Sequence, residues 1–167
     1  MRILGIDPGT ATTGFGVIEV LTDDKYRLID LGLISTDKKT PHGQRLDQIY
    51  SGISKVITKH HPDVVAIERL FFATNALTAI AVGQAIGVIK LAIHHGGLEV
   101  FDYAPMQVKL MVGGSGKADK DLMKKTIKKL FKIRETKGMK THFDNTADAL
   151  AIAICHARKS NKNIPLS

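Results

Sequence analysis

The sequence predicts an α/β fold in which a mixed sheet is flanked by helices. Short β-branched segments dominate residues 1–35, and amphipathic helical periodicity dominates much of the remaining chain. The predicted order is three strands, a helix, a strand, a helix, a fifth strand and further helices. No internal repeat or low-complexity segment interrupts this order. We therefore expect a single domain over residues 1–160 and a short polar C-terminal tail over residues 161–167.

Three short strands open the chain. Residues 2–7 form a buried apolar run, and residues 14–21 and 26–35 follow with many β-branched side chains. Asp23 and Asp24 supply a turn between the second and third of these segments. Tight turns between consecutive strands predict an antiparallel meander.

A helix, a strand and a second helix come next. Residues 42–60 carry apolar side chains at helical spacing, and Pro62 ends this helix. Residues 63–68 form a compact apolar run, which is typical of a central strand reached through a crossover helix. Residues 74–95 predict a longer helix that a glycine pair stops.

The remaining chain is predicted to hold a fifth strand and three helices, with loops between them. These elements are a strand over 98–103, a short helix from Pro105, a glycine-rich loop over 113–116, an amphipathic helix over 119–131, a mobile basic linker over 134–142, and a final helix over 145–158 with Asp144 as its N-cap. The final helix is rich in Ala, Leu and Ile, so we expect it to pack on the sheet.

The positive charge is concentrated in one segment. The net charge is +8, from 24 basic and 16 acidic side chains, and residues 117–140 hold ten Lys or Arg against three acids, which is +7. A basic segment of this kind is typical of a protein that binds a phosphate backbone. A solvated helix face is the other interpretation, and charge alone does not separate the two.

Several function classes are disfavoured. The single cysteine, Cys155, cannot form an internal disulfide, which suits a reducing compartment. The N-terminus shows no secretory signal, and the apolar stretch over 79–93 is interrupted by Gln84 and Lys90. We therefore expect a cytoplasmic protein with no membrane partner.

Two acidic residues stand at the ends of predicted strands. Asp7 follows the first apolar run and precedes a sharp turn at Pro8 and Gly9, and Glu68 ends the strand over 63–68. If these strands are parallel, both carboxylates lie at one edge of the sheet. Repulsion between them would be relieved by a divalent cation. The alternative is that each acid caps a strand end and meets a lysine.

A third acid begins the last helix. Asp148 lies one turn from Asp144 and Asn145, on roughly the same helical face. Because the helix after it is strongly apolar, we expect Asp148 to point towards the sheet edge of Asp7 and Glu68. Acid at a helix start also complements the helix dipole, which is the structural alternative. Three converging acids suit two-metal phosphodiester hydrolysis.

These segments resemble the RuvC family of RNase H-like nucleases. The matching motifs are Gly5-Ile6-Asp7-Pro8-Gly9, Ala66-Ile67-Glu68, residues 75–87, Gly116-Lys117-Ala118-Asp119-Lys120 and Ala147-Asp148-Ala149-Leu150-Ala151. The resemblance covers nearly the whole chain. It implies a five-stranded mixed sheet with helices on both faces, and a homodimeric endodeoxyribonuclease that resolves four-way (Holliday) junctions in recombination and repair by symmetric nicking. It also implies two Mg²⁺ ions per active site, with Mn²⁺ able to substitute, and a RuvA/RuvB-type branch-migration complex as partner.

The resemblance also implies roles for individual residues. The catalytic and metal-binding set is Asp7, Glu68, Asn145 and Asp148, and the DNA-binding set is Phe71, Lys109, Lys117, Lys120 and Lys124. Lys109 and Lys120 match backbone contacts near the cut, and Phe71 matches a ring that stacks on an unpaired base. Asn145 departs from the family, which has an acid or a histidine there. We place Asn145 among the ligands, with Asp144 as the alternative.

Two other interpretations stay open at this point. Asn145 makes a catalytically impaired junction-binding protein conceivable. The segments 5–10 and 12–14 also resemble the phosphate-binding hairpin of actin-like ATPases and sugar kinases, although such enzymes need two domains. On the long helix, Ala79, Gly83 and Gly87 recur every four residues, which suits either a dimer contact or packing on the sheet.

Overall fold

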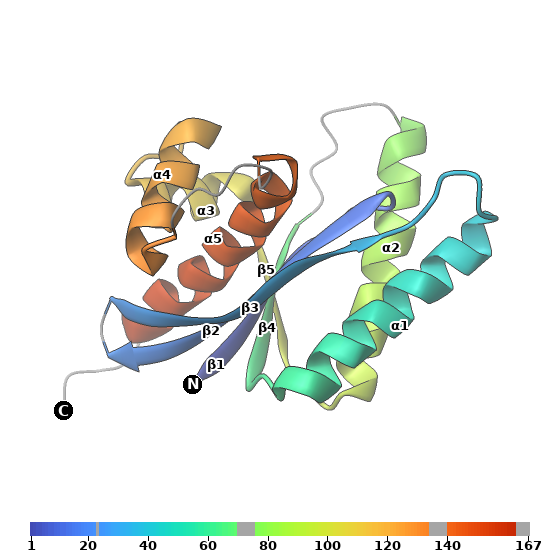
Figure 1. The fold of residues 1–167 in the computed structure, drawn as a ribbon, viewed down its shortest axis with the longest axis horizontal. Coiled ribbons are helices and arrows are strands. Elements are labelled where there is room, and N and C mark those ends of the chain that lie inside the picture. Colours follow the sequence, from blue (N-terminus) through green and yellow to red (C-terminus); the bar gives the residue numbers. More distant parts are fainter. Residues whose placement is uncertain (23, 70–75, 134–139, 163–167) are drawn as a thin grey trace.

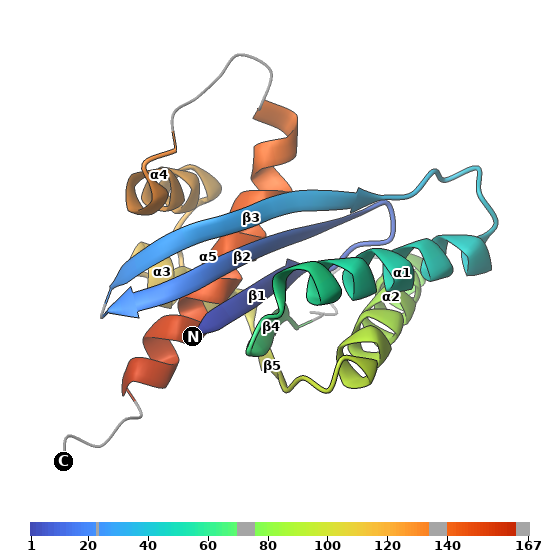
Figure 2. The same cartoon turned by 60° about the horizontal axis from the view of Figure 1, so that its bottom comes forward.

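The computed structural model of the chain describes residues 1–22, 24–69, 76–133 and 140–162. Within these residues, a five-stranded sheet lies between two groups of helices (Figures 1 and 2). The strands are β1 (Arg2–Asp7), β2 (Thr12–Thr22), β3 (Lys25–Ser35), β4 (Val64–Glu68) and β5 (Val100–Tyr103). The helices are α1 (His42–His60), α2 (Ala76–His95), α3 (Pro105–Gly113), α4 (Lys120–Phe131) and α5 (Lys140–Lys162).

The sheet is mixed, as predicted. Its strand order is β3-β2-β1-β4-β5. The first three strands form the expected antiparallel meander, whereas β4 runs parallel to β1 and β5 runs parallel to β4. The two parallel strands are reached through α1 and α2, because a parallel connection needs a crossover element. β1 and β4 therefore end at the same edge of the sheet.

Helices cover both faces of the sheet, and each face has its own apolar core. α1 and α2 lie on one face, while α3, α4 and α5 lie on the other (Figures 1 and 2). Successive side chains of β1 alternate between the two cores. Leu4 and Ile6 pack with α1 and α2, and Ile3 packs with α5. Odd-numbered positions of β1 therefore face α5.

The start of α5 differs from the prediction. The helix begins at Lys140, so the predicted N-cap, Asp144, lies inside it, and the last three residues of the predicted linker are helical. Residues 134–139 of that linker lie outside the described residues. Phe143 is buried in the core beneath α4, and Asp144 pairs with Lys124 of α4. These tertiary contacts stabilise an extra helical turn that the local sequence does not predict.

Three strand glycines form a groove that receives α5. Gly5 and Gly16 are opposite each other on β1 and β2, and Gly14 is opposite Asp7. A Cβ atom at Gly5 would lie 2.1 Å from the Ala149 carbonyl oxygen, and one at Gly14 would lie 2.4 Å from the Asn145 carbonyl oxygen. The missing side chains thus let the helix backbone approach the sheet.

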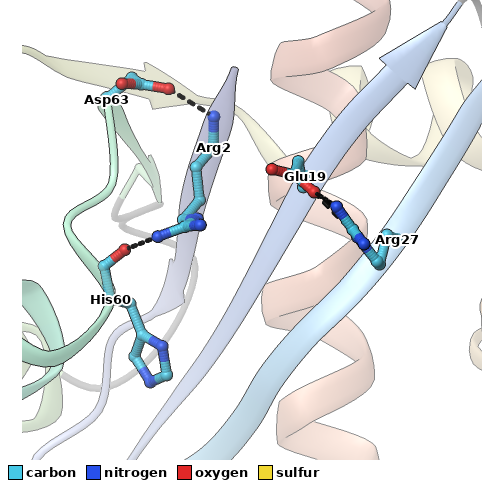
Figure 3. A network of polar contacts seen from close by, with 5 residues as sticks. All are labelled: Arg2, Glu19, Arg27, His60 and Asp63. Atoms are coloured by element: carbon cyan, nitrogen blue, oxygen red, sulfur yellow. Dashed lines mark hydrogen bonds and ion pairs between the residues drawn. The ribbon is translucent and has the colours of Figure 1, made fainter.

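The other end of β1 is tied to the segment between α1 and β4. The Arg2 backbone N–H donates to the Asp63 carboxylate at 2.6 Å, and the Arg2 guanidinium donates to the His60 carbonyl (Figure 3). Beside it, Arg27 of β3 pairs with Glu19 of β2. The Arg2 contacts hold the beginnings of β1 and β4 together, which supports their parallel register.

The long helix α2 leaves much of its surface uncovered. In the described part of the chain, Thr78–His95 is the one helical segment that meets a length and hydropathy criterion for crossing a membrane, although Gln84 and Lys90 interrupt its apolar run. The criterion considers only the length and composition of the helix. Ala85 and Ile89 are fully buried against the sheet, whereas Ile80 is 60% exposed and Leu91 47% exposed.

Candidate active site

Asp7 and Glu68 lie next to each other at the edge where β1 and β4 end. The parallel register pairs Ile6 with Ile67, so the next residue on each strand brings the two acids side by side. Strand alternation also gives them the same face. Asp7 is an odd-numbered position of β1 and so faces α5. Glu68 continues the series of Val64 and Ala66, which belong to the core on the α5 side of the sheet.

The N-terminal half of α5 brings Asp148 to the same edge. Asp148 immediately precedes Ala149, whose carbonyl lies over Gly5 of β1. One turn earlier, the Asn145 carbonyl lies over Gly14, the residue paired with Asp7. The glycine groove therefore places both Asn145 and Asp148 at the sheet edge where Asp7 stands.

The three acids interact electrostatically. Burial raises the pKa of Asp7 to about 7, and repulsion from Glu68 and Asp148 adds to the rise. Burial also raises the pKa of Glu68, with repulsion from Asp148 as the next contribution. Burial raises the pKa of Asp148 as well, while Lys120 acts in the opposite direction. The site thus concentrates negative charge that is only partly compensated by the protein.

Two lysines from different helices supply the opposing charge. Lys120, at the start of α4, lowers the pKa of Asp7, Glu68 and Asp148 against the effect of burial. Lys109 of α3 acts in the same direction on Glu68 and Asp148. Both predicted backbone-contacting lysines therefore lie beside the acidic cluster. A phosphate placed between acids and lysines would meet positive charge on one side.

The other predicted DNA-binding residues have different surroundings. The Lys124 ammonium lies 2.7 Å from a carboxylate oxygen of Asp144, so its charge is engaged within the protein. Lys117 is exposed, in the loop that follows α3. Phe71 lies outside the described residues.

Hydrogen bonds from side-chain hydroxyl groups stabilise the β1–β2 turn. The Thr13 hydroxyl donates to the Gly9 carbonyl at 2.8 Å, and the Thr36 hydroxyl donates to the Thr10 carbonyl at 2.6 Å. Arg45 of α1 in turn donates to the Thr36 hydroxyl at 2.8 Å. These bonds hold the loop next to Asp7 in one conformation.

The chemistry of the acidic cluster fits a divalent cation. Carboxylates and an amide oxygen are the hard donors that Mg²⁺ prefers, and excess negative charge favours a cation. Among the described residues, however, no three acidic, histidine or cysteine side chains converge closely enough to form a ready cation cage. The donor types fit the metal, and the ligand set stays a prediction.

Sequence reasoning missed two features around the acids. One is the groove of Gly5, Gly14 and Gly16, for which the signal was two glycines at alternate positions of one strand. The other is the pairing of Lys124 with Asp144, which joins α4 to α5. The lysine spacing on α4 was visible, but a partner on another helix could not be read from it.

Known proteins are similar to this chain in both sequence and fold. A family model described as crossover junction endodeoxyribonuclease RuvC matches residues 3–156. The chain belongs to the RuvC family. The RuvC of Chloroflexus aurantiacus is 47% identical over 159 residues, which cover 94% of this chain and 93% of the relative. The RuvC of Caldicellulosiruptor saccharolyticus is 42% identical over 161 residues, which cover 96% and 95% of the two chains.

A solved RuvC structure is also similar. It is T. thermophilus RuvC in complex with a Holliday junction substrate, at 32% sequence identity and a TM-score of 0.88, covering 97% of this chain and 96% of that chain. The RNase H-like architecture predicted from the sequence motifs is thereby confirmed.

Proposed function

We propose that this RuvC-family chain resolves four-way DNA junctions by metal-dependent nicking at the cluster of Asp7, Glu68 and Asp148. The observation that carries the proposal is that β1, β4 and α5 place three partly buried carboxylates at one sheet edge, where Lys120 acts electrostatically on all three. Family membership supports the same function. Neither the impaired binding protein nor the kinase-type domain is favoured by any of these observations.

The acids and Asn145 would hold the metal. Asp7, Glu68 and Asp148 offer carboxylate oxygens, and Asn145 offers an uncharged amide oxygen. Two Mg²⁺ ions, or Mn²⁺ in their place, would supply activation of the attacking water and stabilisation of the leaving 3′ oxygen. Burial of Asp7 makes its charge costly in the free protein, which strengthens its attraction to a cation.

The lysines would hold the DNA. Lys120 and Lys109 would bind phosphates beside the acids and offset charge on the phosphate being cut. Lys117 would bind the backbone farther from the cut. Phe71 keeps its proposed role of stacking on an unpaired base at the junction centre.

Asn145 gives a prediction for metal affinity. We expect Asn145→Ala to raise the Mg²⁺ concentration needed for half-maximal cleavage about tenfold, because one oxygen ligand is lost. Asn145→Asp should lower that concentration, since it adds a charged oxygen at the same place. Titration of cleavage rate against Mg²⁺, with direct Mn²⁺ binding by calorimetry, measures both. If Asn145→Ala changes nothing while Asp144→Ala abolishes metal binding and cleavage, Asp144 is the ligand.

We also propose that the active form is a homodimer through α2. Symmetric nicking of two opposed strands requires two active sites. The uncovered apolar side of α2, with Ile80 and Leu91, supports this surface. A Cβ atom at Gly87 would meet nothing within 4 Å in the monomer, so packing in the monomer does not require that glycine. A second copy that packs closely against α2 would require it.

Gly87→Leu should therefore weaken the dimer without disturbing the fold. A side chain that enters a close interface costs about 1–3 kcal/mol, so we expect the dimer dissociation constant to rise about 10- to 100-fold. Light scattering during size exclusion over a dilution series measures it. Gly43→Leu on α1, at an exposed glycine with open space around it, is the matched control. An unchanged dimer in Gly87→Leu would remove α2 from the interface.

The cellular setting follows from the same reaction. A resolvase acts where junctions form, so we propose a cytoplasmic location and a RuvA/RuvB-type branch-migration complex that delivers the junction.

The function is tested with a synthetic four-way junction that has a mobile core, in the presence of Mg²⁺. We expect cleavage of the junction, no cleavage of linear duplex of the same sequence, and loss of cleavage with EDTA. Tight binding of the junction without cleavage at any Mg²⁺ or Mn²⁺ concentration would favour the impaired binding protein.

A further inference from the structure

Three lysines of α4 lie on the side of the helix that faces α5. Lys120, Lys124 and Lys128 follow one another at intervals of four residues, so they share one side of the helix. Lys120 acts electrostatically on Asp148, and Lys124 pairs with Asp144 one turn earlier on α5. Lys128 lies 5.2 Å above the ring centre of Phe143. Lysines on successive turns of α4 therefore contact the N-terminal turns of α5.

Lys124 lies in the middle of this series and is held between the helices. Its side chain is 24% exposed, and its ammonium is 2.7 Å from the Asp144 carboxylate. Asp144 precedes Asn145 and lies one turn before Asp148. Lys124 follows Lys120 by one turn. The ion pair thus links the helical turn that follows Lys120 on α4 to the helical turn that precedes Asp148 on α5.

We propose that the ion pair of Lys124 and Asp144 is a positioning contact that sets Lys120 relative to Asn145 and Asp148 for the cut. The proposal rests on the proposed junction-cleaving function. Met123 and Ile127 already bury the underside of α4 in the core shared with Phe143 and Leu150, so the helices stay packed without the pair. What the pair adds is the registration of one helix along the other. A partly exposed ion pair contributes little to stability, and its effect is expected on catalysis.

Lys124 as a phosphate contact is the competing interpretation, and the two differ in what they change. A phosphate contact contributes to junction affinity and to its salt dependence, with a slope of about 0.9 per phosphate. A positioning contact alters the rate of cleavage in the bound complex and leaves affinity unchanged.

The test compares Lys124→Gln with the wild type on the four-way junction. Cleavage is measured at saturating protein with Mg²⁺, and affinity is measured by fluorescence anisotropy with Ca²⁺ over a range of salt. We expect the cleavage rate to fall about tenfold, as misplaced groups do, with affinity and salt slope unchanged. Lys124→Arg should recover most of the rate. The exchange Lys124→Asp with Asp144→Lys should cleave faster than either single variant. Lys129→Gln, an exposed lysine of the same helix, is the control for lost charge.

The outcomes separate the two proposals. Lower affinity and a flatter salt slope, with an unchanged rate at saturation, would overturn the positioning role and make Lys124 a phosphate contact. If the wild type cuts junctions and Lys124→Gln has the same cleavage rate and affinity as the wild type, the positioning role is overturned too. A wild type that cuts no junction would overturn the proposed function, and the positioning role with it. Thermal unfolding of each variant shows whether a lost rate reflects a lost fold.

Discussion

Asp7→Asn should abolish junction cleavage and at the same time stabilise the metal-free protein. The loss of activity should be about a thousandfold, because a carboxylate that would hold the cation at the reacting phosphate is removed. The gain in stability comes from the cost of keeping Asp7 charged. Its pKa is about 7 in the fold, against 3.8 ordinarily, because burial and the neighbouring acids oppose ionisation.

The sign of the stability change depends on pH. The folded state keeps the Asp7 proton up to about pH 7, whereas the unfolded chain releases it near pH 4, so stability of the metal-free protein falls as pH rises through this window. Above it, Asp7→Asn removes the whole penalty. We expect a gain of about 2 kcal/mol, less than the full shift would give, because water reaches part of the carboxylate.

Thermal unfolding in EDTA at pH 8 and at pH 4 measures this gain. The melting temperature of Asp7→Asn should exceed that of the wild type by about 5 °C at pH 8, and the two should converge near pH 4. Saturating Mg²⁺ should narrow the gap at pH 8, because a cation that binds the folded wild type stabilises it. A variant that is less stable than the wild type at pH 8 would mean that the Asp7 charge is not a burden on the fold.

Gly14→Ala should lower cleavage about 100-fold while the protein still folds. The added methyl group would lie 2.4 Å from the Asn145 carbonyl oxygen, which is backbone and cannot rotate away. The start of α5 must therefore move off the sheet, and it carries Asn145 and Asp148 with it away from Asp7. A displacement of this size at a catalytic group costs about two orders of magnitude in rate. The crowding should also reduce the free energy of unfolding by about 1–3 kcal/mol.

Cleavage and chemical denaturation of Gly14→Ala, measured together, check both effects. Gly43→Ala is the control, because a Cβ atom there meets nothing within 4 Å and alanine is the better helix former. It should cleave normally and be slightly more stable. Wild-type cleavage by a folded Gly14→Ala protein would show that the groove does not set the position of α5.

Much of the fold could be predicted because its signals are local. The helix over residues 42–60 and the strand over residues 2–7 have the predicted bounds, since each is marked by apolar periodicity and a breaker. The predicted start of α5 was wrong, because the first turn of this helix is stabilised by Phe143 in the core and by Lys124 on another helix. Contacts between distant segments leave no such local mark.

The site was partly predictable for a similar reason. Asp7 and Glu68 each end an apolar strand, and the register of β1 and β4 brings them together as expected. How closely α5 approaches the sheet could not be predicted, because this approach depends on Gly5 and Gly14 facing backbone carbonyls of α5. The role of Lys124 could not be separated from that of its neighbours, since spacing alone does not distinguish a solvated lysine from one paired across two helices.

The most direct test of the central claim uses a supercoiled plasmid with an inverted repeat that extrudes a four-way junction. Paired symmetric nicks at such a junction turn the circle into a linear product, whereas a single nick only relaxes it. With Mg²⁺, we expect the wild type to give linear DNA cut at the junction and Asp7→Asn to give none. Absence of any junction-specific product from the wild type, or equal product from Asp7→Asn, would contradict resolution by this acidic site.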